Sequence, residues 1–148
     1  GNASPATVPA KGRYMFQDLD RYAKRYGVPL KFNPQFPINT LMLMRAVTGI
    51  QSRQPERFCA FIECLFKALW VDGRSLDESA TVAAVLIENG FNPHEVLALT
   101  ADEEVKATLK DNTEKAVRRG VFGAPSMFVG DQLYFGQDRL DFVLEALS

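Results

Sequence analysis

Apolar residues recur at helical spacing through most of this chain, and short runs of strand type stand near its two ends. The widest stripe lies between residues 58 and 69, where six apolar side chains repeat every three or four positions. The predicted helices cover 13–26, 39–50, a segment that begins at Pro55 and is stopped by Asp72 and Gly73, 81–89, a short segment from 93, and a long segment that opens at 100–103 and runs to 119. The pattern therefore predicts a chain with a large helical excess.

Three short segments carry the strand pattern instead. Residues 28–32 form one, and residues 126–129 and 132–135 form a pair separated by Gly130 and Asp131, which are typical turn residues. Gly136 then ends the second run, and a last helix opens at 137–138 with apolar residues at helical spacing. We expect a tight hairpin followed by a helix at the C-terminal end.

Helix boundaries are indicated by capping residues. The segments 75–78 and 100–103 read as capping boxes that open the helices after them. Gly27, Gly90 and Gly120 each follow a helical pattern and are expected to end it.

Bulk properties describe one ordinary globular domain. The chain has 148 residues, 47% of them hydrophobic, and a formal net charge of −1, so nothing favours nucleic acid or an anionic membrane surface as a partner. Cys59 and Cys64 are five apart on one predicted helix, which places them on divergent faces and argues against a disulfide. There is no Cys-x-x-Cys pair, and a reducing cytoplasm suits this composition.

Pro125 stands directly before the first strand of the predicted hairpin, where a proline need not donate to the ladder. A small residue, a proline, a hairpin, a glycine and a helix in this order resemble the end of a thioredoxin-fold domain. The run 120–129 with 135–140, and the N-terminal stretch 1–15, are similar to the branch of 2-hydroxychromene-2-carboxylate isomerases and kappa-class glutathione transferases within the DsbA-like group. The resemblance covers essentially the whole chain.

The resemblance implies a single α/β domain over 1–148 with a thioredoxin-like (DsbA-like) fold and a helical insertion. Residues 1–36 and 119–148 would be the thioredoxin-like part, and 37–118 the insertion. It also implies an N-terminally incomplete domain, because the family's first strand and helix have no counterpart here. Strand 28–32 would then lack its central neighbour.

The same resemblance implies glutathione as the cofactor and a cis bond between Ala124 and Pro125, whose backbone would align the cysteinyl part. It carries further ligand contacts to Asn2, Lys11, Gln137 and Asp138. Physical chemistry agrees for Asp138, since a carboxylate in a first helical turn offers a partner to the ammonium of a γ-glutamyl group, while unpaired N–H groups there suit its carboxylate. The alternative for Asp138 is an ordinary charge at a helix N-terminus without a ligand. The alternative for Asn2 and Lys11 is a solvated loop that contacts no ligand.

No catalytic residue is predicted within this chain. The family's activating serine has no counterpart, and neither Ser4 nor Ser126 matches its position. His94, the lone histidine, reads as an exposed residue of a helix-capping turn. Trp70 reads as core, although in this branch the helical block also walls the aromatic substrate pocket.

Three functions remain open. The first is a glutathione-dependent isomerase of the 2-hydroxychromene-2-carboxylate type in aromatic catabolism, acting as a cytoplasmic homodimer on a small aromatic substrate. The second is a kappa-like glutathione transferase. The third is a DsbA-like domain that binds a partner without catalysis. Because the activating serine is missing, the chain alone is expected to be inactive.

Overall fold

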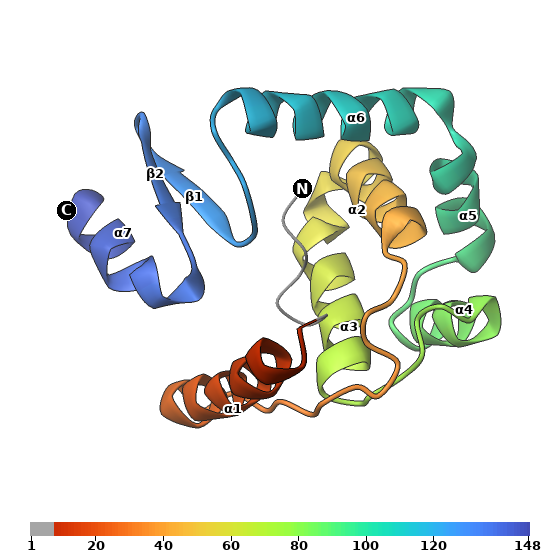
Figure 1. Cartoon of the computed structure of the whole chain (residues 1–148). Helices are drawn as coiled ribbons and strands as arrows, with labels where there is room; N and C mark the ends of the chain where they lie inside the picture. The colour runs from red at the N-terminus through yellow and green to blue at the C-terminus, as the bar shows by residue number, and fades with distance from the viewer. Residues whose placement is uncertain (1–7) are drawn as a thin grey trace. The chain divides into compact units, whose positions relative to one another are not determined.

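The computed structural model describes residues 8–148, and the chain forms two compact units whose division falls inside helix α6. We call Gly1–Val105 the helical unit and Lys106–Ser148 the hairpin unit. Figure 1 labels the α-helices and β-strands of the chain, and two short 3-10 helices, η2 and η3, complete the list of elements. In order they are α1 (Pro9–Tyr26), α2 (Leu41–Arg53), η2 (Pro55–Arg57), α3 (Phe58–Trp70), α4 (Ser79–Glu88), α5 (Pro93–Ala101), α6 (Glu103–Arg118), β1 (Ser126–Val129), β2 (Gln132–Phe135), η3 (Gln137–Arg139) and α7 (Leu140–Ala146).

The core of the helical unit is made by α2, α3, α4 and α5, which pack on one another in that cyclic order. Ile50 on α2, Phe61 on α3 and Val85 on α4 are fully buried, and the Phe61 ring meets the edge of the Phe91 ring at 5.0 Å between centroids. Gly49 allows α2 and α5 to approach closely, since an added Cβ would lie 2.8 Å from the Leu99 Cβ. The stripe predicted between 58 and 69 is thus largely a packing surface.

Helix α1 begins earlier than the pattern predicted. The helix predicted over 13–26 begins at Pro9 instead, because a proline suits the first position of a helix and leaves no backbone N–H unpaired. Lys11 is therefore a helical residue. The predicted end is confirmed: Gly27 adopts φ 66° and its N–H bonds back to the carbonyls of the last turn.

The strand predicted at 28–32 does not form, and this prediction was wrong. The segment is irregular and its side chains are exposed. Its backbone is held instead by the Lys31 N–H, which donates to the Trp70 carbonyl at 2.6 Å. No strand of the described residues pairs with it, and an extended segment without a paired neighbour is not a strand.

Asn33 anchors the end of this segment. Its side chain is fully buried, and its amide nitrogen donates to the carbonyls of Leu69 (3.1 Å) and Arg74 (2.9 Å). Its Oδ1 accepts from the Gln35 N–H at 2.9 Å. One buried amide thus ties the segment after α1 to the end of α3, because a buried polar group must find partners.

The two predicted capping boxes are not the caps that the structure uses. Helix α4 begins after Glu78 without a side-chain cap, and the cap of α6 is Asp102, two residues after Thr100. Asp102 Oδ1 accepts from the N–H groups of Glu104 (2.8 Å) and Val105 (3.2 Å). Thr100 is buried and its hydroxyl donates to the Leu97 carbonyl, so it serves α5 instead.

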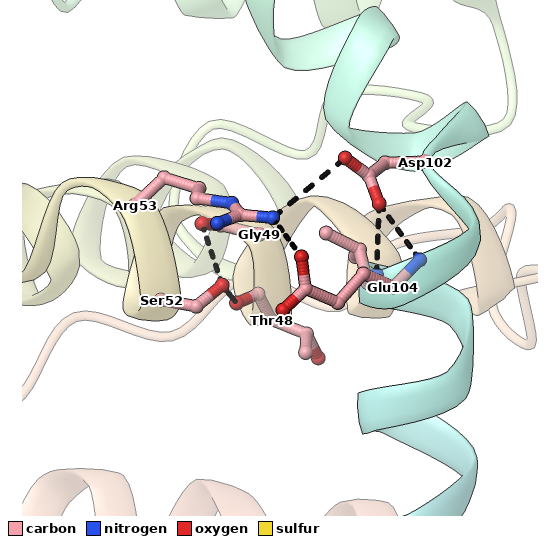
Figure 2. A network of polar contacts seen from close by, with 7 residues as sticks. Thr48, Gly49, Ser52, Arg53, Asp102 and Glu104 are labelled. Atoms are coloured by element: carbon pink, nitrogen blue, oxygen red, sulfur yellow. Dashed lines mark hydrogen bonds and ion pairs between the residues drawn. The ribbon is translucent and has the colours of Figure 1, made fainter.

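Arg53, at the end of α2, reaches the same junction (Figure 2). Its guanidinium pairs with Glu104 and lies 3.9 Å from Asp102. The N-terminus of α6 is therefore held to α2 by side chains as well as by its own cap.

The hairpin unit contains the predicted hairpin and final helix. Strands β1 and β2 are antiparallel, with Ser126 opposite Phe135 and Val129 opposite Gln132, so Gly130 and Asp131 make a two-residue turn. Arg119 braces it: its guanidinium lies 3.5 Å from the centroid of the Phe128 ring and donates to the Gly130 carbonyl. Helix α7 packs against β1.

Removing the Asn33 anchor should destabilise the helical unit. Asn33→Ala leaves two carbonyls and one N–H unpaired in a buried position, so we expect the free energy of unfolding to fall by about 2–3 kcal/mol. Urea unfolding followed by Trp70 fluorescence measures it, because this single tryptophan lies at the anchored site. The control is Asn112→Ala on the exposed face of α6, expected to change the value by under about 0.5 kcal/mol. Equal effects would contradict the role given to Asn33.

The Asp102 cap makes a second stability prediction. Asp102→Ala should cost about 1 kcal/mol because two N–H groups at the start of α6 lose their acceptor. Glu104→Gln removes only an exposed ion pair with Arg53 and should cost under about 0.5 kcal/mol. If the same fluorescence assay ranks the two variants the other way round, the ion pair and not the cap holds this junction.

Candidate functional site

Four of the six predicted site residues lie in the hairpin unit, where the chain enters and leaves the hairpin. The Ala124–Pro125 peptide bond is cis, which confirms the prediction, and both residues are exposed. Gln137 and Asp138 belong to η3, the short helical turn that leads into α7. A second cis bond, between Phe36 and Pro37, was not predicted.

One backbone hydrogen bond brings these two segments together. The Gly136 N–H donates to the Pro125 carbonyl at 3.0 Å, which extends the pairing of β1 and β2 by one position. Ser126 steadies the loop before the proline, since its hydroxyl donates to the Gly123 carbonyl at 2.6 Å. Pro125 and the start of η3 are consequently neighbours although ten residues lie between Pro125 and Gly136 in the sequence.

The backbone of Ala124 is available to a ligand. Within residues 8–148, neither its N–H nor its C=O has a hydrogen-bond partner. Backbone groups that are not paired inside a protein can pair with an extended peptide, as an added strand does at a sheet edge. The loop before β1 thus offers one unpaired donor and one unpaired acceptor, both on Ala124.

The position of the Asp138 carboxylate depends on Gly136, two residues earlier in the chain. Gly136 has φ 101°, and a Cβ added there would lie 2.5 Å from Asp138 Oδ1, so the carboxylate lies directly against this backbone. Only glycine adopts this conformation without strain and leaves that space open. The hydrogen bond to Pro125 and the close contact to Asp138 meet at the same residue.

Arg139 is the residue at this site that sequence reasoning missed. Its Nη1 lies 2.7 Å from Asp138 Oδ2 and 3.3 Å from the Asp138 carbonyl oxygen. Both side chains are partly exposed, at 47% for Arg139 and 40% for Asp138. The adjacent opposite charges were the available signal, but neighbouring residues in a sequence need not face each other.

The other two predicted contacts, Lys11 and Asn2, are not residues of the hairpin unit. Lys11 belongs to the helical unit, in the first turn of α1, and its role stays a prediction. Asn2 lies outside the described residues.

His94 and Trp70, to which the sequence assigned no catalytic role, make structural contacts. His94 is exposed, as predicted, and its backbone N–H donates to the Asn92 side chain that caps α5. Trp70, predicted as core, is only half-buried and does not belong to the main core cluster; its ring lies 5.3 Å from that of Phe36. The described residues hold no group of three potential metal-binding side chains. None of their helices combines the length and apolar character needed to span a membrane.

The two cysteines are free thiols in different environments. Cys59 is exposed, whereas Cys64 is buried and its Sγ donates to the Phe61 carbonyl at 3.1 Å. Burial raises the pKa of the Cys64 thiol because the thiolate would lose its hydration. Neither thiol lies in the hairpin unit.

A cis proline before a hairpin, a helix after it and a helical block ahead of it define a thioredoxin-like protein with a helical insertion. The chain belongs to the family of DSBA-like thioredoxin domains, whose model matches residues 1–148.

Within this family, the chain is similar to proteins of two names. A Pseudomonas putida protein named 2-hydroxychromene-2-carboxylate isomerase is 28% identical over 148 residues, which cover 99% of this chain and 70% of the relative. Human glutathione S-transferase kappa 1 is 27% identical, over 100% of this chain and 71% of the relative. A solved structure of 2-hydroxychromene-2-carboxylate isomerase superposes with a TM-score of 0.82 at 26% identity, over 99% of this chain and 70% of that one.

The environments of the cysteines predict selective thiol chemistry. A disulfide reagent such as dithionitrobenzoate should modify Cys59 quickly and Cys64 slowly, because the thiolate is the nucleophile and the Cys64 thiol is buried. Absorbance at a fixed pH would follow the release of the reagent's chromophore. Cys59→Ser should remove the fast phase, and denaturant should make both thiols of the unchanged protein react. Two fast thiols in the folded protein would contradict the burial of Cys64.

Proposed function

We propose that this chain binds glutathione at the loop before β1 and the start of η3. The observation that carries the proposal is the unpaired Ala124 backbone beside a cis proline, joined to the Asp138 carboxylate through Gly136. Ala124 would pair with the cysteinyl part of the tripeptide, and Asp138 would accept from the γ-glutamyl ammonium. The N–H groups of Gln137 and Asp138 open a helical turn, where such groups have no acceptor in the helix itself.

The residues present suit this ligand in type and in order. A thiol tripeptide has a peptide backbone in its middle and a zwitterionic head at one end. The site has backbone donor and acceptor groups at Ala124 and, across one hydrogen bond, a carboxylate at Asp138. Lys11 and Asn2 complete the proposed contact set, with Lys11 reaching a carboxylate of the ligand.

We further propose that the reaction is the isomerisation of a 2-hydroxychromene-2-carboxylate or a closely similar aromatic acid. The names and similarity of the bacterial relatives and of the solved isomerase support this reaction class. When bound, glutathione supplies a thiolate whose reversible addition to the substrate permits bond rotation before elimination returns the thiol unchanged. The residues named here hold and orient the thiol, and we assign none of them to its activation.

The proposed setting is the cytoplasm, with the protein as a homodimer that takes glutathione and a small aromatic substrate. Free thiols at Cys59 and Cys64 are compatible with a reducing compartment. The Ser126 hydroxyl donates to the Gly123 carbonyl, so we do not assign Ser126 to activation of the thiol.

The alternative within the enzyme class is a kappa-type glutathione transferase, supported by the human and nematode relatives. Product analysis separates the two. An isomerase leaves the concentration of free thiol constant while substrate is converted, whereas a transferase consumes one thiol for each electrophile. A DsbA-like domain that binds a partner without catalysis would show neither reaction.

Asp138 provides the direct test of the glutathione site. Asp138→Asn removes the negative partner of the ammonium, and hydrogen bonds to charged groups are worth about 1.5–3 kcal/mol, so affinity should fall about tenfold to a hundredfold. Titration calorimetry with reduced glutathione measures the dissociation constant. Gln137→Ala should cost less, since its backbone N–H is the proposed contact.

The matched control is Asp131→Asn, in the two-residue turn at the other end of the hairpin. It makes the same change of charge away from the proposed ligand and should leave the affinity unchanged. If both aspartate variants bind glutathione as the unchanged protein does, Asp138 is not part of the site. If the unchanged chain shows no heat of binding, the glutathione proposal fails as a whole.

A further inference from the structure

Two exposed aromatic rings stand at the entrance to the hairpin. Phe122, in the loop before β1, is 73% exposed, and Phe135, the last residue of β2, is 42% exposed. Their ring centroids lie 4.6 Å apart, with the ring planes tilted by 49°. Single exposed apolar side chains are common on proteins, whereas two rings in contact form a continuous apolar surface. We call this surface the aromatic pair.

The aromatic pair is fixed to the loop backbone at Gly123. A Cβ added to Gly123 would lie 2.8 Å from the Phe135 Cε2, so the Phe135 ring lies directly against this backbone. The Gly123 carbonyl accepts from the Ser126 hydroxyl at 2.6 Å, and Ser126 stands opposite Phe135 in the β1–β2 register. The loop that carries Phe122 is thus held to the first residue of β1 and to the last residue of β2.

Both rings lie near the backbone proposed to bind the thiol peptide. Phe122 is two residues before Ala124, so their Cα atoms are at most about 7 Å apart. Phe135 directly precedes Gly136, whose N–H donates to the Pro125 carbonyl at 3.0 Å. A ligand whose cysteinyl part pairs with Ala124 carries its sulfur at this end of the hairpin. A group attached to that sulfur is therefore within reach of the aromatic pair.

The aromatic pair suits a small planar ring. Aromatic rings in contact gain more than their buried area alone would give, because the edge of one ring is attracted to the face of another. Two phenyl rings also offer only enough surface for one ring of a ligand, far less than a stable interface between proteins requires. The pair has no charged or hydrogen-bonding side-chain group, so it selects a ligand by its shape and its π system.

We propose that Phe122 and Phe135 bind the aromatic ring of the substrate to which the thiol adds, and that Phe122 determines the preference for an aromatic group. This inference rests on the proposed glutathione site and adds to it the residues that hold the second reactant. It follows that an aromatic group on the sulfur of glutathione raises the affinity for this chain, and that the gain is lost without the Phe122 ring.

Three S-substituted glutathiones test the inference in titration calorimetry. S-methylglutathione measures the peptide part, S-benzylglutathione adds an aromatic ring, and S-(cyclohexylmethyl)glutathione adds a saturated ring of similar size. The benzyl compound should bind about tenfold more tightly than the methyl compound and about threefold more tightly than the cyclohexylmethyl compound. Phe122→Ala should remove the advantage of the benzyl compound and leave the affinity for the methyl compound unchanged. Phe122→Tyr keeps a ring and should keep most of that advantage.

Phe142→Ala is the matched control, because it removes an exposed aromatic side chain of α7 from the same unit and should change none of the three affinities. Circular dichroism establishes that each variant is folded. Equal affinities of the unchanged chain for the benzyl and methyl compounds would overturn the inference whether or not any variant folds, and so would an undiminished benzyl advantage in folded Phe122→Ala. Both outcomes leave the glutathione site standing, whereas a lack of binding by all three compounds defeats both proposals.

Discussion

The hydrogen bond from the Gly136 N–H to the Pro125 carbonyl holds the candidate site together. It continues the β1–β2 pairing by one position and so places the loop that enters the hairpin beside the turn that leaves it. Everything proposed for the site depends on that adjacency, because Ala124 lies on one side of the bond and Asp138 on the other. The positive φ of Gly136 serves the same end, since it turns the chain so that the Asp138 carboxylate lies against the backbone.

In the helical unit, the segment after α1 is held by a few separate hydrogen bonds and not by strand pairing. Residues 28–32 lack a neighbouring strand among the described residues, and their attachment passes through the Lys31 N–H and the buried Asn33 side chain. A side-chain amide thus performs part of what a β-ladder would have done. Around it, Phe16 packs on Phe32 and Phe36 packs on Trp70, so an aromatic surface borders the anchored segment.

The two units differ in what stabilises them. The helical unit has a continuous core built on Ile50, Phe61 and Val85, and Gly49 lets two of its helices approach closely. In the hairpin unit, no side chain belongs to the main core cluster. Its order comes from local pairing, from the Arg119 guanidinium over Phe128 and from the contact of α7 with β1. A site of backbone groups suits such a unit, because hydrogen-bond geometry and not deep burial positions them.

What the sequence determined by itself was local. The hairpin, its turn at Gly130 and Asp131, the helical stripes and the glycine at the end of α1 follow from the spacing of apolar residues and from turn chemistry, which act between near neighbours. The cis Ala124–Pro125 bond was predicted only with the help of a family resemblance. Tertiary structure decided the rest. Residues 28–32 have strand propensity but no strand to pair with among the described residues. Asp102 caps α6 in place of Thr100, because Thr100 is buried on α5. Arg139 pairs with its neighbour Asp138 in the turn that follows Gly136. In each case the outcome depended on which distant groups were within reach, and spacing along a chain does not contain that information.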